Sequence, residues 1–121
     1  QSVAIIGVGT VGLLALQIAK TAGIKVHAVD QRKKSLDLAT ELGADSVINT
    51  EDSDPVQAIR DVTGGIGADI VIEAAGAPGT PELSIKMART GGTVVIVAIF
   101  DSKPPFDFNS ASLAKSADSS T

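Results

Sequence analysis

Apolar residues along this chain occur either in short continuous runs or in longer stretches with helical spacing. Five runs rich in β-branched residues have the length of strands that are buried on both faces. They span residues 2–6, 25–30, 46–49, 69–73 and 93–99. Between them, apolar residues recur every three or four positions, as they do on one face of a helix. This alternation of strand and helix predicts an α/β fold with a parallel sheet.

Four helices are expected between the strands. The first begins after Gly9, and the second covers residues 31–42 with Leu38 facing inward. The third has Asp54 as its cap and Pro55 in its first turn, and the fourth begins at Thr80. The inward face of the first helix is predicted to comprise Val11, Leu14, Ala15, Ile18, Ala19 and Ala22.

Right-handed crossovers between five such strands predict a doubly wound, three-layer αβα sheet with spatial order 3-2-1-4-5. Ligands bind such sheets where the strand order reverses, here at the carboxyl ends of the first and fourth strands. The domain is predicted to span residues 1–109, with no sixth strand, and residues 110–121 have the composition of a disordered tail. The fifth strand would then keep a bare edge through which a homo-oligomer could form.

The turn after the first strand carries the most specific motif of the chain. Gly7, Gly9 and Gly12 have the GxGxxG spacing of a dinucleotide-binding loop, between a predicted strand and a predicted helix. The free N–H groups of Thr10 and Val11 would open that helix toward a pyrophosphate. A methyltransferase loop is the nearest alternative, but the spacing before the helix favours a dinucleotide.

An acidic residue, Asp30, ends the second strand eighteen residues after Gly12. A carboxylate at this place accepts hydrogen bonds from the adenosine ribose and repels a 2′-phosphate, so the sequence favours NAD over NADP. Arg32 and Lys33 oppose this preference, because a nearby cation can stabilise a 2′-phosphate. The alternative interpretation of Asp30 is an ordinary strand-end or helix-capping carboxylate.

Composition excludes several classes of function. Among 121 residues there are three Phe and no Trp or Tyr, so the core must be aliphatic. A net charge of −4 argues against nucleic acid or anionic membranes as partners. The absence of Cys excludes disulfides and thiolate ligands, and the single histidine, His27, is expected to be structural rather than a metal ligand. No apolar stretch is long enough to span a membrane, and a cytoplasmic location is expected.

Four segments resemble the coenzyme-binding domain of the medium-chain dehydrogenases. They are GVGTVGLLALQIAK (7–20), ELGAD (41–45), GADIVIEAAG (67–76) and GGTVV (91–95). The resemblance extends from Val3 to about Asn109. It is stronger to the zinc-dependent alcohol and polyol dehydrogenases of this family than to the quinone reductases.

The resemblance implies further cofactor-binding positions. Residues that match those around the nicotinamide are Val11, Val97, Ala98 and Ile99. Ala74 and Ala75 match the loop beside the adenosine. Residues that match the adenosine-side loop after the second strand are Gln31, Arg32 and Lys33.

The resemblance also implies an alcohol dehydrogenase-like oxidoreductase that transfers hydride between an alcohol and NAD(H). In that family the zinc and the proton relay belong to a separate domain, which is expected to be absent from this chain. We therefore predict no catalytic or metal-binding residue here, and expect this chain to bind NAD without turnover. Two alternatives remain: a stand-alone nucleotide-binding or regulatory module, and an NADPH-dependent quinone reductase domain.

Overall fold

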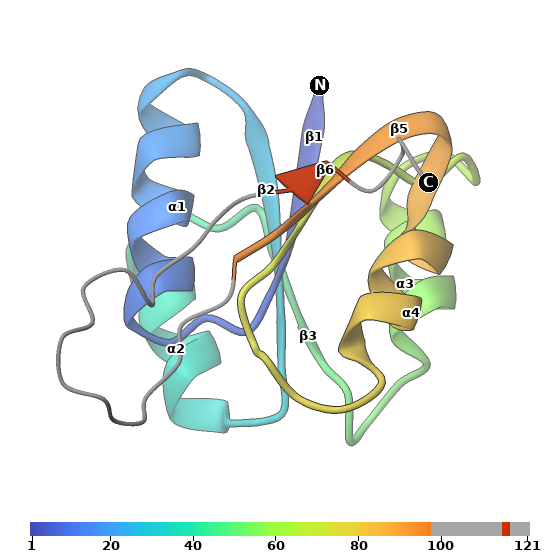
Figure 1. The fold of residues 1–121 in the computed structure, drawn as a ribbon. Coiled ribbons are helices and arrows are strands. Elements are labelled where there is room, and N and C mark those ends of the chain that lie inside the picture. Colours follow the sequence, from blue (N-terminus) through green and yellow to red (C-terminus); the bar gives the residue numbers. More distant parts are fainter. Residues whose placement is uncertain (98–114, 117–121) are drawn as a thin grey trace, which may run out of the picture.

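The structure is a computed structural model that describes residues 1–97 and 115–116. Strands and helices alternate along the chain, as the sequence predicts (Figure 1). The strands are β1 (Ser2–Ile6), β2 (Lys25–Asp30), β3 (Ser46–Asn49), β4 (Ala68–Glu73), β5 (Ala88–Ile96) and β6 (Lys115–Ser116). The helices are α1 (Thr10–Thr21), α2 (Lys33–Glu41), α3 (Pro55–Val62) and α4 (Thr80–Met87). Within the described residues, no helix has the length and apolar character needed to cross a membrane.

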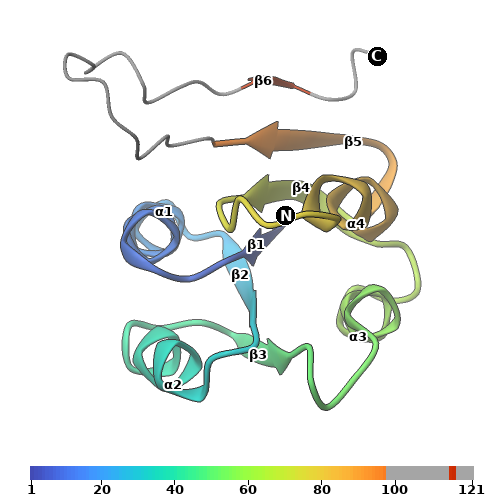
Figure 2. The ribbon, with the colours of Figure 1, turned by 60° about the horizontal axis from the view of Figure 1, so that its bottom comes forward.

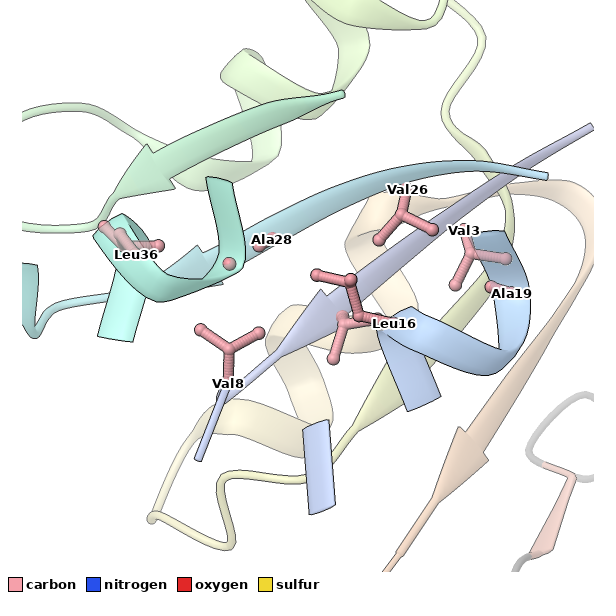
Figure 3. Packing of buried hydrophobic residues seen from close by; sticks show 9 residues of the cluster. Val3, Val8, Leu16, Ala19, Val26, Ala28 and Leu36 are labelled. Carbon is pink, nitrogen blue, oxygen red and sulfur yellow. The ribbon is translucent and has the colours of Figure 1, made fainter. Parts of the chain in front are cut away.

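The first five strands form one parallel sheet in the order β3-β2-β1-β4-β5, which confirms the predicted class and strand order. Helices α1 and α2 cover one face and α3 and α4 the other (Figure 2). Side chains of β1 therefore alternate between two apolar clusters, with Val3 and Ile5 in one and Ala4 and Ile6 in the other. Figure 3 shows the first cluster, in which Leu16 of α1 packs over β1 and β2.

The prediction that no sixth strand follows β5 is wrong. Residues 115–116 form β6, which pairs antiparallel with Val95 and Ile96. The free N–H and C=O groups at the outer edge of a sheet offer such pairing to any segment that returns to them. The edge of β5 is therefore not bare at Val95 and Ile96, and this removes the reason to expect self-association through these two residues. Residue 109, the predicted end of the domain, lies outside the described residues.

Helix α1 is rotated relative to the predicted orientation. The residues buried against the sheet are Gly12, Leu16 and Ala19, whereas Leu14 and Ile18 are 54% and 69% exposed. The cause is the close approach of Gly12 to β1: a Cβ at Gly12 would lie 2.0 Å from the carbonyl oxygen of Gly7. Residues four and seven positions after Gly12 share its face of the helix, so they are the ones that become buried.

Two smaller differences concern α2 and β5. Leu36 and Ala39 are the buried residues of α2, and Leu38 is 43% exposed instead of facing inward. Strand β5 begins at Ala88 instead of residue 93, because Ala88 already pairs with Ala68 of β4; the register then shifts before Ile70 pairs with Thr93. The capping of α3 is confirmed, since Asp54 Oδ1 accepts a hydrogen bond from Val56 N at 3.1 Å.

Candidate functional site

A cavity of about 580 Å³ opens at the carboxyl ends of β1 and β4, where the strand order reverses. This is the place that the doubly wound topology reserves for ligands, and the volume suits a small-molecule ligand. The turns after β1, β2, β3 and β4 all reach it. Its lining comprises Ile6, Gly7, Gly9, Thr10, Val11, Val29, Asp30, Gln31, Arg32, Thr50, Pro55, Ala74, Ala75, Ala77, Thr80 and Leu83.

The glycine turn is fixed by its neighbours on both sides. Gly7 N donates to Val29 O at 2.8 Å, and Ala74 N donates to Ile6 O at 2.8 Å. Gly7 has φ +90°, and a Cβ there would lie 2.7 Å from Ala75 N. A side chain at this position is therefore excluded by backbone conformation and by space together. The turns after β1, β2 and β4 consequently form one rigid floor of the cavity.

The amino end of α1 points its unpaired backbone donors at this cavity. Gly9 is the N-cap residue, no side chain caps it, and the first turn holds no acid. The first N–H groups of a helix have no intrahelical acceptor, and the helix dipole favours an anion beside them. Beyond its chain neighbours, a Cβ at Gly9 would have only the Arg32 Nη2 atom nearby, at 3.5 Å. The space and the donors fit a pyrophosphate group.

Asp30 lies at the end of β2 and accepts five hydrogen bonds. Three come from backbone N–H groups of Val8, Gln31 and Arg32, at 2.7 to 2.9 Å. The other two come from the guanidinium of Arg32, with Nε 3.0 Å from Oδ1 and Nη2 2.8 Å from Oδ2. Burial disfavours the charge, but the hydrogen bonds from Arg32 and Val8 outweigh it and lower the pKa of Asp30 to about 2.

This low pKa makes the Asp30 carboxylate a source of stability against acid. Its pKa is lower in the folded than in the unfolded chain, so its contribution is complete above about pH 4 and lost as the pH falls toward 2. A shift from 3.8 to about 2 corresponds to about 2 kcal/mol. When urea denaturation is measured at a series of pH values, we expect the free energy of unfolding of the wild type to fall by about 2 kcal/mol more than that of Asp30→Asn between about pH 4 and pH 2. Asp45 and Asp69 titrate in both proteins, so only the difference between the two curves reports on Asp30. An equal fall in both proteins would contradict the prediction.

Glu73 holds the turn between β4 and α4, which contributes Ala74, Ala75 and Ala77 to the lining of the cavity. Its side chain is 1% exposed. Its Oε2 atom accepts hydrogen bonds from Ala75 N and Gly76 N at 2.9 Å and from Thr80 Oγ1 at 2.8 Å. Glu73 is the last residue of β4. The structure shows that it determines where Ala75 lies.

Nine of the predicted site residues line the cavity together. They are Gly7, Gly9, Thr10, Val11, Asp30, Gln31, Arg32, Ala74 and Ala75. Gly12 lies on the buried face of α1, and Lys33 forms an exposed ion pair with Asp37 at 3.1 Å. Val97 N donates to Glu73 O at 2.9 Å without lining the cavity. Ala98 and Ile99 lie outside the described residues.

Several lining residues were missed by the sequence analysis. Thr50 follows β3, Pro55 begins α3, and Thr80 begins α4. The signal was available, because every strand end and following helix start in this topology lies at the same edge of the sheet. Ala77 and Leu83 carry no comparable signal.

Other polar residues of the described chain have structural roles. The His27 side chain is 4% exposed, and its Nδ1 atom lies 2.7 Å from Ser46 Oγ. Burial lowers the pKa of His27, although the Asp45 carboxylate opposes this. Asp69 bonds to Ser2 N at 2.8 Å and to Arg89 Nε at 2.7 Å. Within residues 1–97, no group of three or more His, Asp or Glu side chains could hold a metal ion, so zinc does not fit this part of the chain.

Comparison with known proteins gives consistent matches. Residues 10–118 match the family model described as zinc-binding dehydrogenase. L-threonine 3-dehydrogenase of Bacillus licheniformis is 40% identical over 98 residues, which cover 80% of this chain and 28% of that protein. This chain therefore spans less than a third of the length of that relative.

Solved structures agree in fold and in sequence. The alcohol dehydrogenase TADH from Thermus sp. ATN1 matches with a TM-score of 0.78 and 39% identity, covering 88% of this chain and 32% of that one. A zinc-binding dehydrogenase from Sinorhizobium meliloti 1021, described as bound to NADP, matches with a TM-score of 0.73 and 40% identity, covering 78% and 29% of the two chains. The family model, the relative and the solved structures agree with one another, and the chain therefore belongs to the zinc-binding dehydrogenases of the medium-chain dehydrogenase family.

Proposed function

We propose that this chain is the coenzyme-binding domain of an alcohol dehydrogenase-like oxidoreductase and that its cofactor is NAD(H). The observation that supports this most is the uncapped amino end of α1, which faces the same cavity as Asp30. The amino end of α1 would bind the pyrophosphate, and the Asp30 carboxylate would accept hydrogen bonds from the ribose hydroxyls, so the two together would bind an adenosine diphosphate group.

The chain contributes binding and orientation. Backbone N–H groups at Thr10 and Val11 would hold the pyrophosphate, and the Asp30 carboxylate would accept the adenosine ribose hydroxyls. Gly7 and Ala75, packed against each other, would keep the floor of the site in place. When bound, the nicotinamide supplies the hydride chemistry. The substrate alcohol and its zinc would be held by residues outside those described here.

Calorimetric titration of the purified chain with NAD tests this proposal. We expect one site with a dissociation constant of roughly 1 μM to 1 mM, the range of ordinary cofactor and substrate sites. We also expect no alcohol-dependent formation of NADH. Absence of any nucleotide binding would overturn the proposal.

Asp30→Ala supplies the residue-level test. The loss of a carboxylate that hydrogen-bonds the ribose should weaken NAD binding by about tenfold or more. Asp37→Ala is the matched control, because Asp37 is an acid on α2 that does not line the cavity. Wild-type preference for NADP would instead favour the quinone reductase alternative.

A further inference from the structure

Strand β3 forms one edge of the sheet, and part of its backbone is free there. It pairs with β2 on one side, and no strand of the described residues pairs with its other side (Figure 2). Thr50 N, directly after the strand, donates to Asp30 O at 3.1 Å. Backbone groups of successive strand residues point in opposite directions, so those of Val47 and Asn49 point away from β2. Asn49 O accepts from the following turn, which leaves the N–H and C=O of Val47 and the N–H of Asn49 available to another strand.

An apolar hollow runs beside this edge, between α2 and α3. Its volume is about 540 Å³, and none of its lining residues belongs to the cavity at the carboxyl ends of β1 and β4. Val47 and Val62, which line the hollow, are 40% and 44% exposed. Apolar side chains beside unpaired backbone groups suit the binding of an extended peptide segment by strand addition. The apolar part of the lining comprises Leu36, Val47, Ile48, Ala58 and Val62.

Three carboxylates line the same hollow. They belong to Asp37, Asp52 and Asp61. Lys33 is the only cation among the lining residues, and it forms an ion pair with Asp37 at 3.1 Å. No described residue forms an ion pair with Asp52 or Asp61. The hollow therefore carries two uncompensated negative charges beside the open strand edge.

The charge of the hollow indicates which kind of segment would cover it. A second copy of this chain would bring the same carboxylates against these, and the chain as a whole has a net charge of −4. Charged side chains at a sheet edge oppose such pairing between copies. A segment with lysine or arginine side chains would instead be attracted to Asp52 and Asp61, while its backbone could pair with Val47 and Asn49.

We propose that β3 and the hollow beside it are a docking surface for an extended basic segment of a partner protein. The segment adds to the sheet as a strand next to β3. Its apolar side chains contact Val47 and Val62, and its cations pair with Asp52 and Asp61. Only three backbone groups are free for it and each hydrogen bond adds little net free energy, so the complex is weak and transient. Docking leaves the coenzyme cavity open, because the two sites share no lining residue.

Nuclear magnetic resonance titrations of the chain with two blocked hexapeptides test this proposal. One peptide alternates lysine with valine, and the other alternates glutamate with valine. We expect the lysine peptide to bind with a dissociation constant of roughly 0.1 to 1 mM and to shift the amide signals of Val47 and Asn49 most. The glutamate peptide should bind about tenfold more weakly or worse, because its charges are repelled. Unchanged signals at these two amides in about 5 mM lysine peptide would overturn the proposal, as would equal binding of the two peptides.

Val47→Pro separates strand addition from attraction between charges alone. Proline removes the N–H that points to the open edge, and an edge strand tolerates proline where its N–H faces solvent. This variant should bind the lysine peptide about fivefold more weakly or worse, whereas Val47→Thr keeps the N–H and should stay within about twofold of the wild type. A lysine peptide that is N-methylated at alternate residues should lose affinity equally on the wild-type chain, so the test does not depend on how Val47→Pro folds. Undiminished binding of the N-methylated peptide would overturn the proposed strand addition.

The role of the carboxylates is tested by combining Asp52→Asn with Asp61→Asn. The double variant should bind the lysine peptide about threefold more weakly or worse at low salt, and the difference should shrink at high salt. The matched control combines Glu41→Gln with Glu82→Gln, which removes two negative charges from residues outside the hollow. An equal loss in both double variants would show attraction to the whole chain only and would overturn the proposal. Elution of the chain as a dimer that Val47→Pro abolishes would identify a second copy as the occupant and would likewise overturn it.

Discussion

Gly12→Ala is expected to lower the free energy of unfolding by about 3 kcal/mol. The new Cβ would lie 2.0 Å from the Gly7 carbonyl oxygen and 3.3 Å from Cγ2 of Ile5. The Gly7 backbone cannot yield, because its N–H is bonded to Val29 and its Cα side faces the Ala75 backbone. Helix α1 would have to lift from β1 and expose Leu16, which outweighs the helical preference of alanine over glycine.

Urea denaturation measures this effect, and Gly9→Ala is its control. Gly9 lies three residues earlier, and its added methyl would meet only the flexible end of Arg32 at 3.5 Å. The free energy of unfolding of Gly9→Ala should therefore differ from that of the wild type by less than about 1 kcal/mol. The affinity of Gly9→Ala for NAD should fall, because the methyl group enters the space beside the amino end of α1. Wild-type stability for Gly12→Ala would show that α1 does not depend on this contact.

Glu73→Ala is expected to lower the free energy of unfolding by about 3 kcal/mol and to loosen the turn after β4 that lines the cavity. The substitution removes the acceptor of Ala75 N and Gly76 N, whereas Thr80 Oγ1 keeps Ala77 O as an acceptor at 2.7 Å. Each of these two hydrogen bonds to a carboxylate contributes about 1.5 kcal/mol. Glu73→Gln retains an acceptor oxygen at the same position and should lose about 1 kcal/mol.

Amide hydrogen exchange measures how far the loss of the Glu73 carboxylate loosens the turn after β4. In Glu73→Ala, the amides of Ala75 and Gly76 should exchange at least tenfold faster than in Glu73→Gln, while those of β2 should change little. NAD affinity should fall with the protection of the turn. Equal exchange at these two amides in both variants would mean that the turn is held by its packing on Gly7 and not by the carboxylate.

Much of the fold was predictable because local rules and global topology agree. Strand β3 was predicted at its observed bounds, Ser46–Asn49, and the cap at Asp54 follows from a side-chain bond over two residues. The strand order follows from the handedness of crossovers. The glycine spacing and Asp30 predicted a cavity at the end of β1 because backbone turns need glycine there irrespective of the surrounding side chains.

The orientation of α1 was less predictable, although its sequence contained the signal. Apolar periodicity favoured Leu14 and Ile18 as the inward residues, but both are exposed. Apolar residues occur on several faces of this helix, so the periodicity of apolar residues alone distinguishes those faces poorly. The backbone contact between Gly7 and Gly12 determines the rotation, since packing at atomic contact outweighs a small difference in buried area.

By itself, the sequence determined the alternating α/β fold, the strand order and the glycine turn with its acid at the end of β2. These depend on backbone conformation, side-chain period and short spacings, all of which are legible along a chain. Only the tertiary structure decided that Arg32 covers Asp30, that Glu73 holds the turn after β4 and that β6 pairs with the end of β5. Such features depend on which donor reaches which acceptor once distant segments meet, and residue spacing carries no record of that competition.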